Sequence, residues 1–340
     1  MTCLKDEHLT IPSLSAPLDV GGRTLRNRVV LAPMSGVTDL PFRDLAWRFG
    51  AGLVVTEMVA SRELALNARE SWSRIRNCGI RPHMVQLAGR EAHWMAEAAR
   101  IAEGEGADII DINMGCPAKK VIGGYSGSAL MRDPDHALGL IEATVGAVKV
   151  PVTVKMRLGW DHDSLNAPHI AARAEAAGAA MITVHGRTRM QFYEGKADWD
   201  AIRAVRDVLS IPLVANGDVD TADDAREILR RSGADAVMVG RGAQGRPWHP
   251  AVLAGAAHPS TEEIAAVAVE HYRMMLDFYG VEAGLRHARK HVGWYLERFA
   301  PGFTGPAKAE IMTARDSDAV ADRLATALLA GGAARLGEAA

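Results

Sequence analysis

A cysteine, a lysine and a histidine lie where side chains could take part in catalysis. Cys116 stands in the segment Asn-Met-Gly-Cys-Pro, and the cations Lys119 and Lys120 that follow would lower the pKa of an exposed thiol. Lys155 interrupts the apolar run Val-Thr-Val-Lys-Met-Arg, where a charge is costly unless it is paired or functional. It could form a Schiff base or place a cation beside an electron-rich ligand. A buried, structural role remains open for Cys116 and for His185 in Val-His-Gly-Arg-Thr.

Two glycine-containing segments further along have the form of a phosphate site. They are Asn216-Gly217-Asp218 and Gly240-Arg241-Gly242, which combine closely approachable backbone N–H groups with a guanidinium group. The stretch Gly240–Gly245 also fits the pattern G-x-G-x-x-G of dinucleotide-binding folds. Because Pro247 follows at once and no acidic strand end comes about 20 residues later, we reject that interpretation.

Eight apolar runs separated by helical stretches indicate the fold that positions these residues. The runs predict strands at Arg28–Met34, Leu53–Met58, Met84–Ala88, Asp108–Met114, Val152–Arg157, Met181–His185, Leu213–Asn216 and Ala236–Gly240. Helices are predicted between them at Arg90–Glu103, Pro134–Val148, His169–Ala177, Trp199–Val208 and Thr221–Arg231. Nearly continuous apolar runs are typical of parallel strands buried on both faces. The pattern favours an α/β fold, a (β/α)8 TIM barrel, and Gly21-Gly22 predicts a preceding hairpin that could close its bottom.

Reactive side chains gather where the predicted strands end. In a barrel of this kind the active site lies at the carboxyl ends of the strands, and the last two loops frequently hold phosphate. The residues at these ends are Pro33, Met34, Glu57, Gln86, Asn113, Lys155, Arg157, His185, Arg187 and the two glycine-containing segments, with Cys116 just after the fourth strand. The sequence therefore predicts one site built from many strand ends.

A helical region is predicted after the composition changes near His258-Pro259. Ser260 and Glu263 form a capping box at the start of its first helix, and Gly280 ends that helix. Three more helices are predicted at Leu285–Phe299, Ala307–Thr313 and Ser317–Leu329.

The second of these helices carries a cluster of positive charge. Arg286, Arg289 and Lys290 lie close in sequence to Trp294 and Tyr295. This pattern fits either a solvated helix face over an aromatic core or a basic, aromatic surface for RNA. His287 and His291 are four residues apart on the same helix, but no third ligand for a metal ion is apparent.

The composition limits the class of protein. The 340 residues are 48% hydrophobic and 24% charged, as in ordinary folded proteins. No run reaches the roughly 18 apolar residues of a membrane span and no signal peptide is visible, so we expect a cytoplasmic protein without a membrane partner. The net charge of −2 argues against a general nucleic-acid coat protein but permits a local basic patch. Cys3, Cys78 and Cys116 cannot form a disulfide framework, and we take the first two as incidental.

A series of motifs makes the prediction specific. APMSGVTDLPFR, TEMV, VQLAG, DINMGCPAKKV, VKMRLGWD, VHGRTR, NGDV and GADAVMVGRGAQGRPW follow one another within residues 32–248. Together they closely resemble the tRNA-dihydrouridine synthases, flavin enzymes that reduce uridine in tRNA. The run RHARKHVGWYL is similar to the tRNA-binding helical domain of that family, so the resemblance covers about residues 12 to 320. The stretch GCPAKK is similar to the B type of the bacterial enzymes.

The resemblance implies a role for each candidate residue. Cys116 would be the general acid, and Asn113, Arg157 and Arg187 would contact the uracil. FMN would be held by Pro33, Met34, Ser35, Gln86, Lys155 and His185, with its phosphate on Asn216, Gly217, Asp218, Gly240 and Arg241. NADPH would be the reductant. Residues 12–258 would form the catalytic barrel and residues 259–335 a helical domain that binds tRNA through Arg286, Arg289 and Lys290. We expect no structural metal and no obligate protein partner.

Three other functions remain open from the residues. One is another FMN-dependent barrel oxidoreductase that acts on a free pyrimidine. A second is a tRNA-binding protein whose enzymatic role is secondary. A third is an aldolase that forms a Schiff base at Lys155.

Overall fold

A closed ring of parallel strands forms the centre of the molecule. The computed structural model describes residues 11–338. Nine strands pair in the order β4-β3-β11-β10-β9-β8-β7-β6-β5. They are β3 (Val29–Leu31), β4 (Leu53–Val54), β5 (Val59–Ala60), β6 (Met84–Ala88), β7 (Ile109–Met114), β8 (Val152–Arg157), β9 (Met181–His185), β10 (Leu213–Asn216) and β11 (Ala236–Val239). Because β4 and β5 belong to one stretch of chain, and Val55 between them bridges to Met84 on β6, the sheet closes on itself. The predicted barrel is therefore confirmed.

The second predicted strand is interrupted in the structure. The prediction of a continuous strand at Leu53–Met58 is wrong, since four residues separate β4 from β5: Val55 makes an isolated bridge, and residues 56–58 belong to no strand. At this point the Gln86 backbone N–H donates to the Thr56 hydroxyl, 3.0 Å away, in place of a backbone carbonyl. The side chain of Glu57 then accepts a hydrogen bond from the Gly36 N–H (2.5 Å), which draws the chain out of the sheet.

Helices cover the outside of this ring. Those predicted from the sequence are found within a few residues, as α4 (Ala92–Gly104), α6 (Pro134–Val145), α7 (Ala167–Ala176), α8 (Trp199–Arg206) and α9 (Ala222–Ser232). Helices that were not predicted are α1 (Leu40–Phe49), α2 (Ser61–Ala65), α3 (Arg69–Ile75), α5 (Lys119–Ile122) and α10 (His249–Leu253). Gly127–Arg132 (η1) and Arg241–Ala243 (η2) form 3-10 helices.

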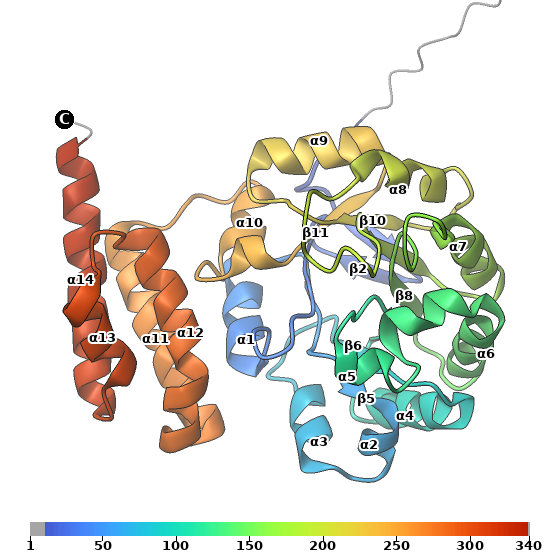
Figure 1. Ribbon diagram of the computed structural model, residues 1–340, viewed down its shortest axis with the longest axis horizontal. Helices are drawn as coiled ribbons and strands as arrows, with labels where there is room; N and C mark the ends of the chain where they lie inside the picture. Colours follow the sequence, from blue (N-terminus) through green and yellow to red (C-terminus); the bar gives the residue numbers. More distant parts are fainter. Residues whose placement is uncertain (1–10, 339–340) are drawn as a thin grey trace, which may run out of the picture.

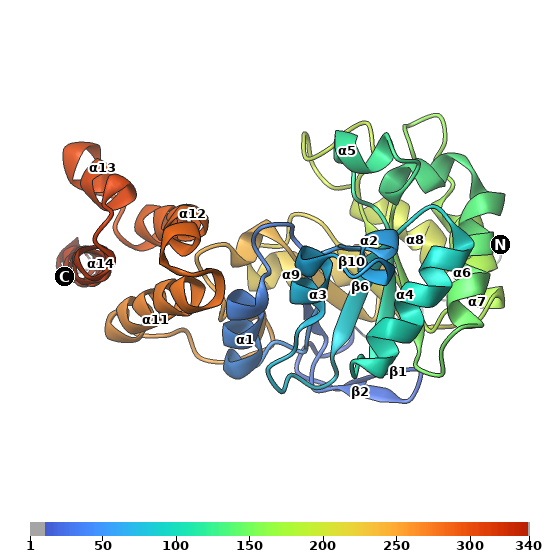
Figure 2. The same ribbon diagram turned by 90° about the horizontal axis from the view of Figure 1, so that it is seen from below.

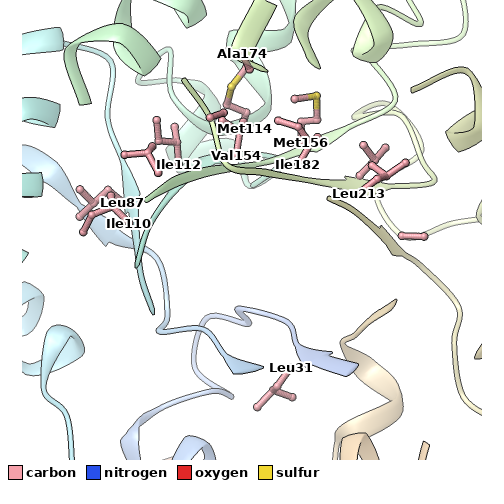
Figure 3. Packing of buried hydrophobic residues seen from close by; sticks show 14 of the residues in the cluster. Leu31, Leu87, Ile110, Ile112, Met114, Val154, Met156, Ala174, Ile182 and Leu213 are labelled. Atoms are coloured by element: carbon pink, nitrogen blue, oxygen red, sulfur yellow. The ribbon is translucent and has the colours of Figure 1, made fainter. Parts of the chain in front are cut away.

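Two apolar layers hold the barrel together. Outward-facing side chains of the strands, such as Leu31, Ile112 and Met156, pack against the surrounding helices, and Figure 3 shows them on the convex side of the sheet. Alternate residues of the same strands face inward. At the bottom of the barrel they meet the hairpin of β1 (Leu18–Val20) and β2 (Arg23–Leu25), whose Leu18, Val20 and Leu25 share one buried cluster with them. The predicted hairpin thus closes this end.

Four helices follow the barrel and pack around a buried cluster of their own. They are α11 (Thr261–Tyr279), α12 (Val281–Phe299), α13 (Gly305–Thr313) and α14 (Ser317–Glu338). The predicted capping box at Ser260 and Glu263 is present. The predictions that α12 begins at Leu285 and α14 ends at Leu329 are wrong, since Gly280 alone separates α11 from α12 and α14 continues for nine residues more. Their buried cluster includes Leu45 of α1 and Trp248 from the barrel region.

The figures show how these parts lie together. In Figure 2 the β1–β2 hairpin is at one end of the barrel and α5 at the other, which is the end where the strands finish. Helices α11 to α14 stand beside the barrel, with α11 against α1 and α14 farther away (Figure 1). Within residues 11–338, no helix combines the length and apolar character needed to cross a membrane.

Candidate active site

A cavity of about 1020 Å³ lies at the carboxyl ends of the strands. Most of the candidate residues line it, although they come from seven different strand ends. These residues are Pro33, Met34, Ser35, Gln86, Asn113, Cys116, Lys155, Arg157, His185, Asn216, Gly217, Asp218, Gly240 and Arg241. The structure therefore brings these candidates together in one place.

The loop that carries Cys116 is fixed on three sides. The Cys116 N–H donates to the Asn113 side-chain oxygen (2.5 Å), and the Cys116 carbonyl accepts from both the N–H and the hydroxyl of Ser128 (3.0 Å each). Arg157 donates from Nε to the Gly115 carbonyl (2.6 Å). At Gly127, with φ at +61°, a Cβ would lie 2.6 Å from the Cys116 carbonyl oxygen, so the close approach requires glycine. The partly exposed thiol consequently has a defined position at the cavity wall.

A buried lysine supplies positive charge to the cavity. Lys155 lies on β8, where side chains alternate across the sheet, and its Nζ donates to the Asn216 side-chain oxygen (3.1 Å). The Asn216 amide nitrogen donates in turn to the Met238 carbonyl (2.8 Å), which fixes its orientation. Burial and the nearby Arg157 lower the pKa of Lys155 to about 8, so the amine is mostly charged at neutral pH. A cation at this depth favours a ligand that carries or gains negative charge.

His185 is a neutral ring beside these cations. Burial and the charges of Lys155 and Arg157 hold the pKa of His185 well below its ordinary value. Its Nε2 lies 3.3 Å from Nη1 of Arg187. Because a guanidinium group can only donate, Nε2 is the acceptor and the proton resides on Nδ1. His185 therefore offers a hydrogen-bond donor without adding charge.

Arg187 lies behind the cavity and does not line it. The residue is 1% exposed, and its side-chain donors reach the carbonyls of Glu194 (3.1 Å) and Gly195 (2.7 Å) and the carboxylate of Asp218 (2.6 Å). Arg157 is also committed to backbone carbonyls, including those of Gly115 and Thr188, although it does reach the cavity wall. In this structure both arginines hold loops in place.

Unpaired backbone N–H groups mark the other end of the cavity. Gly217 has φ at +126° and Asp218 has φ at +55°, a turn that only glycine and a few polar residues adopt readily. Across the part of the chain that the structure describes, the backbone N–H groups of Gly217, Asp218, Gly240 and Arg241 have no hydrogen-bond acceptor. The Asp218 carboxylate is neutralised by Arg187 and by Arg241, 3.2 Å away. Such a set of donors beside a guanidinium fits a phosphate group.

The candidate RNA-binding residues lie on α12, which α11 and α13 flank. Arg286 and Arg289 are exposed, and Arg286 pairs with Glu282 one turn earlier (2.7 Å). Lys290 approaches the barrel: a Cβ on Gly36 would lie 3.0 Å from its Nζ. The positive charge of this helix therefore extends to the loop at the first strand end.

The two histidines of α12 have separate surroundings. The exposed His287 stacks on Tyr279, with ring centroids 4.4 Å apart, while His291 is buried against Phe42 and His271. No group of three potential metal ligands occurs among residues 11–338. The predicted incidental Cys3 lies outside the described residues, and Cys78 is an exposed thiol that donates to Asp44.

Several residues of the site were not predicted. Phe192 and Tyr193 line the cavity from the loop after β9, and Arg298 reaches it from α12. Tyr193 packs under the guanidinium groups of Arg157 and Arg241. The sequence did contain a signal for Phe192 and Tyr193. Two adjacent aromatic residues in a loop after a strand end would be exposed to solvent unless they contact a partner or a ligand. The contact of Arg298 depends on how α12 packs and has no local signal.

The sequence profile of the family described as dihydrouridine synthase (Dus) matches residues 30–329, which is most of the chain. This chain belongs to the dihydrouridine synthase family. It is therefore an enzyme, and the expected similarity is confirmed.

The sequence similarity to two relatives extends over nearly their whole length. A probable tRNA-dihydrouridine synthase from Rhizobium leguminosarum bv. phaseoli is 77% identical over 308 residues, covering 91% of this chain and 97% of that protein. The tRNA-dihydrouridine synthase B of Pseudomonas aeruginosa is 46% identical, covering 88% of this chain and 92% of that protein. Morphinone reductase, at 15% identity, has a TM-score of 0.52 over 74% of this chain and 92% of its own, a similarity of fold alone.

Proposed function

We propose that this dihydrouridine synthase reduces uridine in tRNA to 5,6-dihydrouridine in the cytoplasm, with FMN as cofactor and NADPH as reductant. The cavity is the observation that carries this proposal, because one end is suited to phosphate and the other holds Lys155, His185 and a cysteine. The names of the relatives supply tRNA as the substrate class.

The residues fit FMN in size and in charge. A volume of about 1020 Å³ is at the upper end of ordinary ligand cavities. The four free N–H groups at Gly217, Asp218, Gly240 and Arg241 would bind the phosphate, and Pro33, Met34, Ser35, Gln86, Lys155 and His185 would line the ring. When bound, FMN would supply the hydride that is added to C6 of the uracil. Lys155 would stabilise negative charge on the reduced ring.

The chain's own residues supply the proton and the positioning. Cys116 donates a proton to C5 of the uracil, which balances the hydride added at C6 and leaves a thiolate that is reprotonated from solvent. Asn113 and Arg157 contact the uracil and also hold the Cys116 loop. Arg187 was predicted to contact the base, but its buried donors support a positioning role through Asp218 and His185. The target base has to leave its stack to reach the cavity.

Substitution of Cys116 tests the chemistry. Cys116→Ala should still bind FMN and accept electrons from NADPH, whereas dihydrouridine formation in a tRNA transcript should fall by roughly 10²–10⁴-fold, the usual loss of a general acid. Cys78→Ala is the matched control and should retain wild-type turnover, since Cys78 lies outside the cavity. Wild-type turnover in Cys116→Ala would contradict the assigned role.

Removal of positive charge from α12 tests whether this helix binds tRNA as the substrate. Helices α11 to α14 share a core with Trp248 and Leu45, so deleting them would expose apolar surface and confuse the result. Replacing Arg286, Arg289 and Lys290 together with alanine should raise the KM for tRNA and reduce its salt dependence, with flavin content unchanged. Arg226→Ala with Arg230→Ala, on the exposed face of α9, is the matched control. Reduction of free uridine as efficient as that of tRNA would favour an enzyme of free pyrimidines instead.

A further inference from the structure

A carboxyl group lies inside the barrel beneath the cavity. Asp111 is the third residue of β7, and its side chain is on the inner side, since Ile110 and Ile112 belong to the outer apolar layer. It is 2% exposed. Its two oxygens accept hydrogen bonds from Gln86 Nε2 (2.7 Å) and from the Thr153 hydroxyl (2.5 Å). A carboxyl group this deeply buried is costly unless hydrogen bonds satisfy it, and both of its oxygens have a donor.

From Asp111 a chain of side-chain amides leads to the cysteine. Gln86 uses its oxygen to accept from Asn113 Nδ2 (2.7 Å). Asn113 uses its own oxygen to accept from the backbone N–H groups of Gly115 (3.2 Å) and Cys116 (2.5 Å). Asp111 is therefore three hydrogen bonds away from the peptide of Cys116.

The groups at the two ends of this hydrogen-bonded series determine how each side-chain amide within it is oriented. An ionised carboxylate only accepts, so Gln86 has to turn its nitrogen toward Asp111 and its oxygen toward Asn113. Backbone N–H groups only donate, so Asn113 has to turn its oxygen toward Cys116. A flip of either amide would place two donors or two acceptors against each other. With Asp111 as the fixed acceptor, Gln86 keeps one N–H that is not committed, and Gln86 lines the cavity.

We propose that Asp111 is a positioning residue: by accepting from Gln86 it makes that amide present an N–H to a carbonyl group of the bound cofactor, and through Asn113 it holds the Cys116 loop. This inference rests on the proposed function, because it assumes a carbonyl-bearing flavin in the cavity. Burial raises the pKa of Asp111 to about 6, and the hydrogen bonds and Lys155 oppose that rise, so the carboxyl is mostly ionised above pH 7. Its charge also balances that of Lys155, which faces the same interior.

Cofactor affinity measures the Gln86 orientation without any turnover. FMN is titrated into flavin-free protein and its fluorescence is followed. Asp111→Leu leaves the Gln86 nitrogen without its acceptor, and we expect the Kd for FMN to rise at least tenfold. Thr153→Val is the matched control, because it removes the other partner of Asp111 but leaves the amide chain intact, and its Kd should stay within about threefold of wild type. An Asp111→Leu protein with wild-type Kd would overturn the inference.

A double substitution distinguishes the loss of the Gln86 N–H from a loss of folding. In Asp111→Asn with Gln86→Glu, the asparagine can donate to the new carboxylate, which can still accept from Asn113, so the chain is rebuilt with the charge moved. The flavin-free double variant should therefore have a higher Tm than Gln86→Glu alone, in which two carboxyl groups face each other, yet it should still bind FMN weakly because the N–H is lost. Restored FMN affinity would overturn the inference, and so would a Tm no higher than that of Gln86→Glu. If the wild-type protein itself bound no FMN, the proposed function would fail, which is a separate result.

Discussion

Acid should unfold this protein, because it folds with neutral histidines in its interior. Burial lowers the pKa of His83 and His249 to about 4 and that of His271 to about 3. Burial together with nearby positive charge also holds the pKa of His185 and His291 well below the ordinary value. In the unfolded chain each would titrate near its ordinary pKa of about 6.5.

The sign of the effect follows from which state binds the protons. A histidine with a lowered folded-state pKa is protonated mainly in the unfolded chain, so stability is full above about pH 6.5 and is lost as the pH falls toward about 4. Two carboxyl groups act in the opposite sense, since burial raises the pKa of Asp39 and Asp111 to about 6. Near pH 5 His83, His249 and His271 together exceed the two carboxyls by about one proton, which corresponds to a loss of about 1.4 kcal/mol per pH unit, and His185 and His291 increase this loss in the same direction.

Urea unfolding followed by tryptophan fluorescence at several pH values measures this slope. No hydrogen bond of the His249 side chain is present among the described residues, and its Nε2 is buried without a partner. His249→Leu should therefore reduce the slope by about 1.4 kcal/mol per pH unit. The exposed His136→Leu is the control and should leave the slope unchanged. A free energy of unfolding that stays constant between about pH 6.5 and 5.5, or an unchanged slope in His249→Leu, would refute the reasoning.

Two further predictions concern the helical region and the mouth of the cavity. Trp248 is 1% exposed and packs on Tyr295 and Phe299, so Trp248→Ala should lower the free energy of unfolding by about 3–5 kcal/mol in urea titrations; a loss below about 1 kcal/mol would show that the barrel and the helices do not stabilise each other through it. Tyr125 is 70% exposed, three residues before Ser128, which binds the Cys116 carbonyl, so its ring is available for stacking on a nucleotide base. Tyr125→Ala should weaken tRNA binding about tenfold in a filter-binding assay while Tyr125→Phe should not; equal affinities would contradict this.

The candidate site was largely predictable because its geometry follows from the fold class. Once eight parallel strands are expected, their carboxyl ends have to meet, and residues such as Lys155 and Asn216 come together although 61 positions separate them. Lys155 was recognisable because a charge within an apolar strand is unusual. The end of the cavity with the unpaired backbone N–H groups was recognisable from its glycines, and Gly217 has the positive φ of a turn.

What the sequence did not predict depends on contacts between distant segments. Arg187 stands in the same strand-end motif as His185, yet acceptors on Glu194, Gly195 and Asp218 draw it out of the cavity. Asp111 was missed for a related reason, since only the closed barrel turns it toward Gln86. The break between β4 and β5 likewise depends on a hydroxyl replacing a carbonyl, a choice that hydrophobic pattern does not encode.

The hairpin at the bottom of the barrel has a kinetic consequence. Leu18, Val20 and Leu25 fill that end of the barrel with apolar side chains, whereas the residues that line the cavity lie at the end where the strands finish. A reductant and an RNA substrate would then have to use the same opening in turn. Each should inhibit competitively against the other at high concentration, and initial-rate plots at varied concentrations of both should give parallel lines. A slow release of the spent reductant would limit how fast this enzyme works on every uridine it modifies.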